Sequence, residues 1–285
     1  MKSQKTAFEQ VIRSAGRCIG RYNLIEEGDS LLVGLSGGKD SFVLLETLLV
    51  LQRKSPVKFS LAGAVFDPGF PGFPLEEIRN YCAKRNVAFH STGVPIPQVL
   101  AERPSDKPAC VLCSRLRRGK LYGLAQELKC TKLVLGHHLD DLLASFLISA
   151  LRGGGLTTMA PVSIPDARES CPVIRPLALT DESLIAEAAK SFDFPTDRRC
   201  PYHHQLELSG DRAKAKRLLA QLENDFPGAR KGLTASLAHV EADHLLDLKF
   251  LPGQKNERKK YETQRCSGKD THTFPFGKNS SGNNC

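Results

Sequence analysis

The sequence predicts an α/β protein: a parallel sheet with helices on both faces, then a small helical C-terminal part and a disordered tail. Short apolar runs typical of buried parallel strands alternate with helical patterns between residues 30 and 151. After residue 181 the pattern is helical only, and from Pro252 the chain is rich in Lys, Asn, Ser and Gly. These changes divide the chain into an N-terminal helix (1–28), an α/β domain (29–180), a helical part (181–250) and a tail (251–285).

The first half of the chain shows the alternation most clearly. An amphipathic helix is expected over 6–26, ending before Gly28. It is followed by strand 30–35, helix 41–49, strand 57–66, helix 75–86 and strand 87–90. A polar, proline-containing connection over 91–109 ends this series.

The second half begins with a basic helix over 114–128, strand 132–135 and a helix that runs to about residue 151. Residues 161–171 are loop-like, and 173–177 form a short extended piece. Helices are expected over 181–192, 211–224 and 229–246, and Asp211 suits the N-cap of the second.

A glycine-rich loop links the first strand to the next helix. Its sequence is Ser36-Gly37-Gly38-Lys39-Asp40-Ser41. The glycines allow the backbone to approach a ligand closely, and N–H groups at the start of a helix favour an anion. The serine hydroxyls add donors and the lysine adds positive charge, so the loop suits a pyrophosphate. It differs from the Walker loop and from the Gly-x-Gly-x-x-Gly dinucleotide turn.

Two further polar segments follow strands of the predicted sheet. Asp67 ends the second strand, and Gly136-His137-His138-Leu139-Asp140-Asp141 follows the fourth. Ligands of parallel sheets bind beyond the carboxyl ends of the strands. We therefore expect both segments to lie at the same edge as Ser36–Ser41.

Composition narrows the function classes. Forty Lys and Arg against 31 Asp and Glu give a net charge of +9, which suits a polyanionic partner or simply a solvated basic surface. The N-terminus lacks a signal-peptide pattern, and no apolar stretch is long enough to span a bilayer. We expect a cytoplasmic protein without a membrane partner, whose nine cysteines are metal ligands, reactive thiols or core residues rather than disulfides.

Cys110 and Cys113 have the spacing that chelates one metal ion or cluster. Basic neighbours and a helix start would lower the pKa of these thiols. A redox dithiol needs only this pair, whereas structural zinc needs four protein ligands and no second CxxC pair exists. An iron–sulfur cluster held by three thiolates would leave one iron open. Cys200, in a polar loop, is the best candidate for a third ligand.

Together, these motifs resemble those of the tRNA 2-thiocytidine synthetases of the PP-loop ATP pyrophosphatase superfamily. The resemblance rests on three blocks and on a lone cysteine downstream, and it covers about residues 8–247. The blocks are Leu35–Ser41, Cys110-Val111-Leu112-Cys113-Ser114-Arg115-Leu116-Arg117-Arg118-Gly119 and Leu135–Asp141, with Ile174-Arg175-Pro176-Leu177 completing the pattern.

The resemblance implies an enzyme that binds ATP with Mg²⁺ and adenylates the C2 oxygen of a cytosine in tRNA, at position 32 of the anticodon loop. Sulfur then displaces AMP and gives 2-thiocytidine. Cys110, Cys113 and Cys200 match the family's ligands of a [4Fe-4S] cluster, whose open iron is thought to carry the sulfide. A cysteine desulfurase supplies the sulfur. The oligomeric state is left open, with a homodimer among the alternatives.

The expected site residues divide into two further groups. The residues expected to bind ATP and Mg²⁺ are Ser36, Gly37, Gly38, Lys39, Asp40, Ser41, Asp67 and His137. Catalytic roles are assigned to Asp40, Asp140, Asp141 and Arg117. One of the two adjacent aspartates is expected to meet the phosphates through Mg²⁺, and the other to cap the helix. Asp67 suits a turn before Pro-Gly as well as a metal or ribose contact.

The sequence departs from the family at two places. Leu139 stands where the family usually has arginine, and Cys200-Pro201-Tyr202 is more similar to the tRNA 2-thiouridine synthetases. Those enzymes carry additional zinc-binding cysteine pairs, which this chain lacks. The alternatives are therefore thiolation of uridine or of a small molecule by the same site, or an RNA-binding or redox protein without catalysis.

Overall fold

A computed structural model describes residues 6–102, 109–164, 171–196, 210–247 and 249–250, apart from the side chain of Cys110. The chain divides into two compact units, 1–230 and 231–285. The predicted tail over 251–285 and Cys200 lie outside the described residues.

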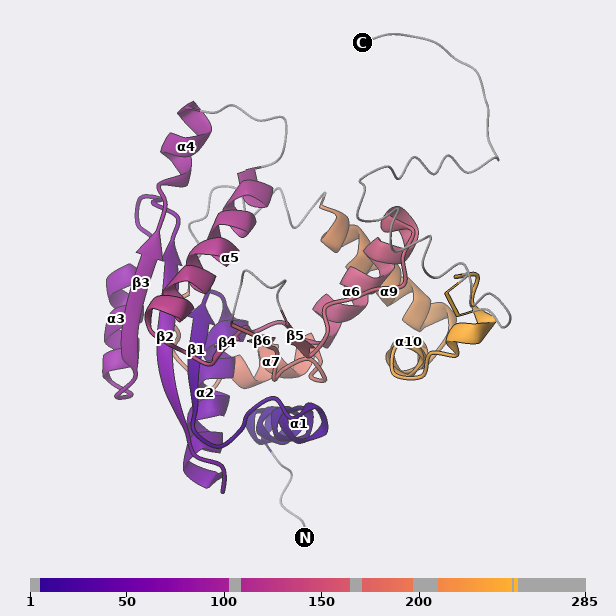
Figure 1. The fold of residues 1–285 in the computed structure, drawn as a ribbon, viewed down its shortest axis with the longest axis horizontal. Helices are drawn as coiled ribbons and strands as arrows, with labels where there is room; N and C mark the ends of the chain where they lie inside the picture. Colours follow the sequence, from indigo (N-terminus) through magenta and orange to yellow (C-terminus); the bar gives the residue numbers. More distant parts are fainter. Residues whose placement is uncertain (1–5, 103–108, 165–170, 197–209, 248, 251–285) are drawn as a thin grey trace. The chain divides into compact units, whose positions relative to one another are not determined.

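Strands and helices alternate over residues 7–102 and again over 109–148, and from residue 182 the described elements of the larger unit are helices (Figure 1). The strands are β1 Asp29–Leu35, β2 Phe59–Asp67, β3 Ala88–Gly93, β4 Lys132–Val134, β5 Val162–Ser163 and β6 Val173–Ile174. The helices are α1 Ala7–Tyr22, α2 Lys39–Lys54, α3 Leu75–Ala83, α4 Ile96–Glu102, α5 Ala109–Glu127, α6 Leu139–Ile148, α7 Glu182–Ala189, α9 Asp211–Asp225 and α10 Ala229–Ser236. A π-helical turn, Ser149–Gly153, extends α6, and a 3-10 turn, Ala242–His244, follows α10, which crosses the unit boundary.

The six strands form one sheet in the order β3-β2-β1-β4-β6-β5. Every neighbouring pair is parallel except β5 with β6. The predicted fold class is confirmed, with β5 as an antiparallel addition at the edge. Because β1, β2 and β4 run in the same direction, their carboxyl ends, and the segments that follow them, share one edge of the sheet.

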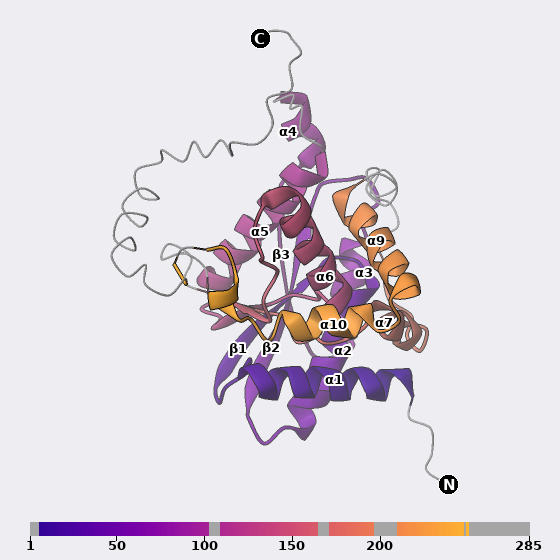
Figure 2. The same cartoon turned by 90° about the vertical axis from the view of Figure 1, so that its right-hand side faces the viewer.

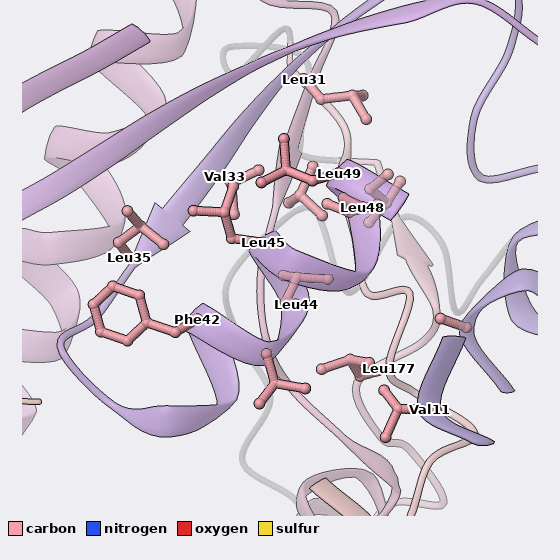
Figure 3. Packing of buried hydrophobic residues seen from close by; sticks show 14 of the residues in the cluster. Val11, Leu31, Val33, Leu35, Phe42, Leu44, Leu45, Leu48, Leu49 and Leu177 are labelled. Atoms are coloured by element: carbon pink, nitrogen blue, oxygen red, sulfur yellow. The ribbon is translucent and has the colours of Figure 1, made fainter. Parts of the chain in front are cut away.

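Alternate residues of β1 face the two apolar layers of the domain. Leu31, Val33 and Leu35 pack with the helices α1, α2, α3 and α7, and Figure 3 shows them opposite the leucines of α2. Leu32 lies in a second cluster with Leu121 of α5. This two-residue period means that both faces of the central strand are buried, as a parallel sheet requires.

The structure corrects several predicted boundaries. The helix expected from Ser114 already includes Ala109, so the CxxC motif lies within α5. The connection over 91–109 contains the end of β3 and helix α4, and the loop-like stretch over 161–171 contributes β5. The N-cap of α9 is Gly210 and not Asp211, which is the first helical residue and pairs with Arg152 at 3.2 Å. None of the helices in the described part of the chain is long and apolar enough to cross a membrane.

Candidate active site

The loop after β1 is fixed by its own two serines. Gly37 has a φ of 80°, which is left-handed backbone that glycine adopts without strain. The Ser41 hydroxyl donates to the Gly38 carbonyl at 2.8 Å and accepts from the Ser36 N–H at 3.2 Å. Since Ser41 is buried, these bonds order the turn that leads into α2. The described geometry fits the sequence-based expectation of a strand, a tight turn and a helix start.

Lys39 carries the positive charge of this loop. Its Nζ atom lies 3.1 Å from an oxygen of Asp40 and 3.5 Å from an oxygen of Glu182, the first residue of α7. Burial favours the neutral amine, but the two carboxylates outweigh it and raise the pKa of Lys39. The lysine is therefore a cation near neutral pH, and both of its close partners are acids.

The segment after β4 packs directly on the start of α2. A Cβ atom added at Gly136 would lie 3.1 Å from the backbone nitrogen of Ser41 and 3.2 Å from the carbonyl group of Asp40. Only glycine allows this approach without displacing backbone. The structure thus brings the two predicted segments, Ser36–Ser41 and His137–Asp141, together at the carboxyl edge of the sheet.

The two aspartates that open α6 have different surroundings. Asp141 is buried and accepts the backbone N–H of His138 at 3.3 Å, so it caps the helix. Asp140 accepts the backbone N–H of Glu182 at 2.8 Å. His138 lies between them, with Nε2 3.4 Å from Asp141 and Nδ1 3.7 Å from Asp140.

His137 is held in the neutral form. Burial lowers its pKa to about 4, the charges of Arg175, Arg212 and His138 add to this effect, and that of Asp141 opposes it. Its Nδ1 atom is buried and has no hydrogen-bond partner among the described residues. A neutral imidazole with a free ring nitrogen can make a polar contact with a ligand without adding charge.

Basic residues from α9 and α10 pair with the acidic groups, and no motif in the sequence predicts these pairs. Arg230 lies 2.8 Å from Asp140, and Arg212 lies 3.8 Å from Asp141. Lys216 donates to Glu182 at 2.7 Å. Figure 2 shows α6 and α9 side by side, which is how α9 delivers two of these cations. Amphipathic spacing in α9 predicts its buried face but not which carboxylate each cation meets.

Asp67 ends β2 at the same edge of the sheet. Its carboxylate accepts the N–H of Gly69 at 2.8 Å, so it does form the turn before Pro-Gly. It also lines a hollow of about 370 Å³ with Ser91, Thr92 and neighbouring residues of the β3 end. The turn and an open approach for a ligand therefore coexist at this residue.

The CxxC motif opens α5 beside the end of β2. Cys113 is half-buried and packs on the cluster of Phe66, Phe70 and Ile96. Phe66 directly precedes Asp67 in the sequence. Arg117 reaches the Cys113 sulfur at 4.0 Å, and its guanidinium lies 5.9 Å from the centre of the Phe66 ring.

Residues of two kinds that can bind a metal lie at this edge of the sheet: the cysteines of α5 and the aspartates of α2 and α6. Cys110 and Cys113 are three residues apart in one helix, a spacing typical of two thiolate ligands. The third expected ligand, Cys200, lies outside the described residues, and the described side chains alone form no group of three metal ligands. Asp40, Asp140 and Asp141 offer the carboxylate oxygens that Mg²⁺ prefers.

Arg175 is a buried residue of the predicted Ile-Arg-Pro-Leu block. Its guanidinium donates to the Ala160 carbonyl at 2.7 Å and to the Ser163 hydroxyl at 2.8 Å, which attaches β5 to β6. Burial lowers the pKa of Arg175, and its charge contributes to the low pKa of His137. The block therefore has a structural role and also affects the electrostatics of the site.

Comparisons with known proteins agree with this geometry. The chain matches the PP-loop domain family over residues 5–197. The tRNA-cytidine(32) 2-sulfurtransferase of Ralstonia pickettii is 40% identical over 235 residues, which cover 81% of this chain and 73% of that protein. The protein of the same name from Geobacter sulfurreducens is 37% identical over 245 residues, 85% of this chain and 94% of that protein.

Among solved structures, the U34-tRNA thiolase NcsA of Methanococcus maripaludis, determined with its [4Fe-4S] cluster, has the same fold. The TM-score is 0.65 at 22% identity, over 82% of this chain and 80% of that one. The match to the PP-loop domain and the identity to these relatives over most of the chain lead to one conclusion: the chain belongs to the tRNA-cytidine(32) 2-sulfurtransferase family of PP-loop enzymes.

Proposed function

We propose that this protein thiolates tRNA in an ATP-dependent reaction, replacing the C2 oxygen of cytidine 32 in the anticodon loop with sulfur. The observation that carries the proposal is the meeting of two segments, the Ser36–Ser41 loop and the His137–Asp141 helix start, at the edge of the sheet where α5 presents Cys113. ATP activation and sulfur transfer need such a common site.

In this proposal the loop residues bind the phosphates of ATP. The backbone N–H groups at the start of α2 and the Lys39 ammonium would bind the negatively charged phosphates. Asp40, with Asp140 or Asp141, would hold Mg²⁺, which lowers the negative charge of the phosphates. His137 would contact the nucleotide as a neutral ring, and Asp67 would border the hollow at the β2 and β3 ends.

Adenylation solves a chemical problem of the reaction. A carbonyl oxygen in a pyrimidine ring is a poor leaving group until it is esterified to AMP. Attack of the C2 oxygen on the α-phosphate releases pyrophosphate, and a sulfur nucleophile then displaces AMP. Arg117, beside Cys113, would stabilise negative charge on the adenylate or on tRNA phosphate.

Cys110, Cys113 and Cys200 would hold a [4Fe-4S] cluster. When bound, the cluster supplies an open iron that can carry the sulfide. A cysteine desulfurase would supply the sulfur, and the site of action would be the cytoplasm, where the protein meets tRNA.

The cysteines provide the test of this assignment. We expect Cys110→Ala, Cys113→Ala and Cys200→Ala each to abolish 2-thiocytidine formation while ATP still binds, because the sulfur carrier is lost and the phosphate loop is intact. The measurement is nucleoside mass spectrometry of tRNA incubated with reconstituted enzyme, ATP, Mg²⁺ and a sulfide source, alongside nucleotide titration.

Cys130→Ala is the matched control, since Cys130 is a half-buried thiol that packs beside α5 in the second apolar cluster, away from the loop. It should retain thiolation. Full activity of Cys200→Ala with its cluster preserved would contradict the triad.

A further inference from the structure

Lys39 and Glu182 form an ion pair that ATP must disturb. The phosphate-loop lysine has two carboxylates within 3.5 Å, Asp40 from its own helix and Glu182 from the start of α7. Its charge is therefore neutralised before any nucleotide arrives. A phosphate that binds the ammonium competes with these carboxylates.

Glu182 is held in place on three sides. One carboxylate oxygen faces Lys39, while the other lies 2.7 Å from Nζ of Lys216 on α9. Its backbone N–H donates to Asp140 at 2.8 Å, which ties the start of α7 to the start of α6. Burial disfavours the carboxylate, but the hydrogen bond and charge of Lys216 outweigh it and lower the pKa of Glu182. The residue is thus a fixed anion beside the loop.

We propose that Glu182 is a positioning residue that acts as a counter-ion for Lys39 in the nucleotide-free enzyme, and that Lys216 sets the strength of this competition. The Glu182 carboxylate would then compete with the phosphates for Lys39 and lower the affinity for ATP. Lys216 would weaken this competition by pairing with the same carboxylate. The inference rests on the proposed binding of ATP to the Ser36–Ser41 loop, and it adds residues from α7 and α9 that the sequence motifs do not include.

The two charges predict effects of opposite sign. Glu182→Gln keeps the shape and the backbone bond to Asp140 but removes the competing charge, so the phosphates should bind more tightly. Lys216→Met leaves Glu182 with Lys39 as its remaining close cation, so the phosphates should bind more weakly. The side chains of Lys39, Glu182 and Lys216 are 33–35% exposed, so solvent screens each pair, and we expect changes of about two- to fivefold in Kd.

The test is calorimetric titration of the full chain with α,β-methylene ATP and Mg²⁺, an analogue that this class of enzyme cannot cleave at the α–β bond. We expect a lower Kd for Glu182→Gln, a higher Kd for Lys216→Met, and smaller differences at higher ionic strength. Matched controls on the same helices are Glu187→Gln, whose partner is the exposed Lys190, and Lys214→Met. Both should bind like the wild type.

Changes in Kd of the same sign in both variants would overturn the counter-ion role, because loss of a purely structural pair would weaken binding in both. An unchanged Kd in both variants would overturn it as well. Weaker binding by Glu182→Gln alone would also overturn it. If the wild type itself fails to bind the analogue, the proposed ATP site is wrong, and the inference fails with it. That outcome is distinct from unequal or absent variant effects on a binding wild type.

Discussion

At the scale of single residues, the site is a set of charges that neutralise one another. Along the chain of contacts Asp40–Lys39–Glu182–Lys216 the charges alternate in sign. Sequence motifs identified the first two, because they belong to a contiguous loop. The other two partners lie more than 140 positions away in the chain, and no local pattern pairs them. Tertiary ion pairs of this kind depend on the folded geometry and not on spacing.

A second charged group lies at the opposite edge of the sheet and stabilises the fold. Asp29 starts β1, is buried, and accepts hydrogen bonds from Lys132 at 2.7 Å and from the Thr131 hydroxyl at 2.6 Å. Burial opposes its ionisation, but the Lys132 and Thr131 hydrogen bonds outweigh burial and lower the pKa of Asp29 below its ordinary value. The group therefore stabilises the protein above its unfolded pKa, and this contribution is lost as pH falls through the lower folded value.

We expect Asp29→Asn to lower the free energy of unfolding by about 1–3 kcal/mol near pH 7, because it removes the buried carboxylate and leaves the half-buried Lys132 with Glu26 as its charged partner among the described residues. The difference from wild type should shrink as pH falls below about 4. Urea unfolding from pH 7 to pH 3 measures both. Glu76→Gln, in an exposed pair with Arg79, is the control and should change little. A difference that stays constant down to pH 3 would contradict the role of ionised Asp29.

At the scale of elements, the parallel strands β1, β2 and β4 were easier to predict than the ends of the helices, whereas the two-residue edge strand β5 was not predicted. The strand β1 and the loop after it follow from an apolar run and two glycines. The start of α9 does not, because Gly210 and Asp211 are adjacent and both residue types are accepted at an N-cap. The start of α5 was predicted too late, at Ser114, because Pro108 and not a cap-type residue immediately precedes Ala109, and Asp106 and Ser105 stand three and four positions earlier.

The contact between α2 and the segment after β4 gives an element-scale prediction. Gly136→Ala would place a methyl group 3.1–3.2 Å from backbone atoms of Ser41 and Asp40, which cannot move without shifting the phosphate loop. We expect the free energy of unfolding to fall by about 1–3 kcal/mol and nucleotide affinity to fall with it. Thermal unfolding and titration with α,β-methylene ATP measure the two effects.

Gly123→Ala is the matched control for this substitution. Gly123 is exposed on α5, and an added Cβ there meets nothing within 4 Å. Alanine should raise stability by up to about 1 kcal/mol because it favours the helix. Wild-type nucleotide affinity in Gly136→Ala would contradict the claim that this contact shapes the loop.

At the scale of the whole molecule, the parallel sheet explains why distant motifs share one site. Residues 36–41, 67 and 137–141 follow three strands whose carboxyl ends lie at one edge, and α5 presents Cys113 to the same region. The alternation of strands and helices was sufficient to predict this arrangement. The covering of the acidic residues by Arg212 and Arg230 was not predictable, because it depends on how α9 and the start of α10 pack on α6.

Nucleoside mass spectrometry of total tRNA decides whether the molecule thiolates cytidine in tRNA. Total tRNA would be compared from a strain that lacks this protein, from the same strain carrying the wild-type chain, and from one carrying Asp40→Asn. We expect 2-thiocytidine to be absent from the deletion strain, restored by the wild type and not restored by Asp40→Asn. Unchanged 2-thiocytidine in the deletion strain, or loss of 2-thiouridine in its place, would contradict the account.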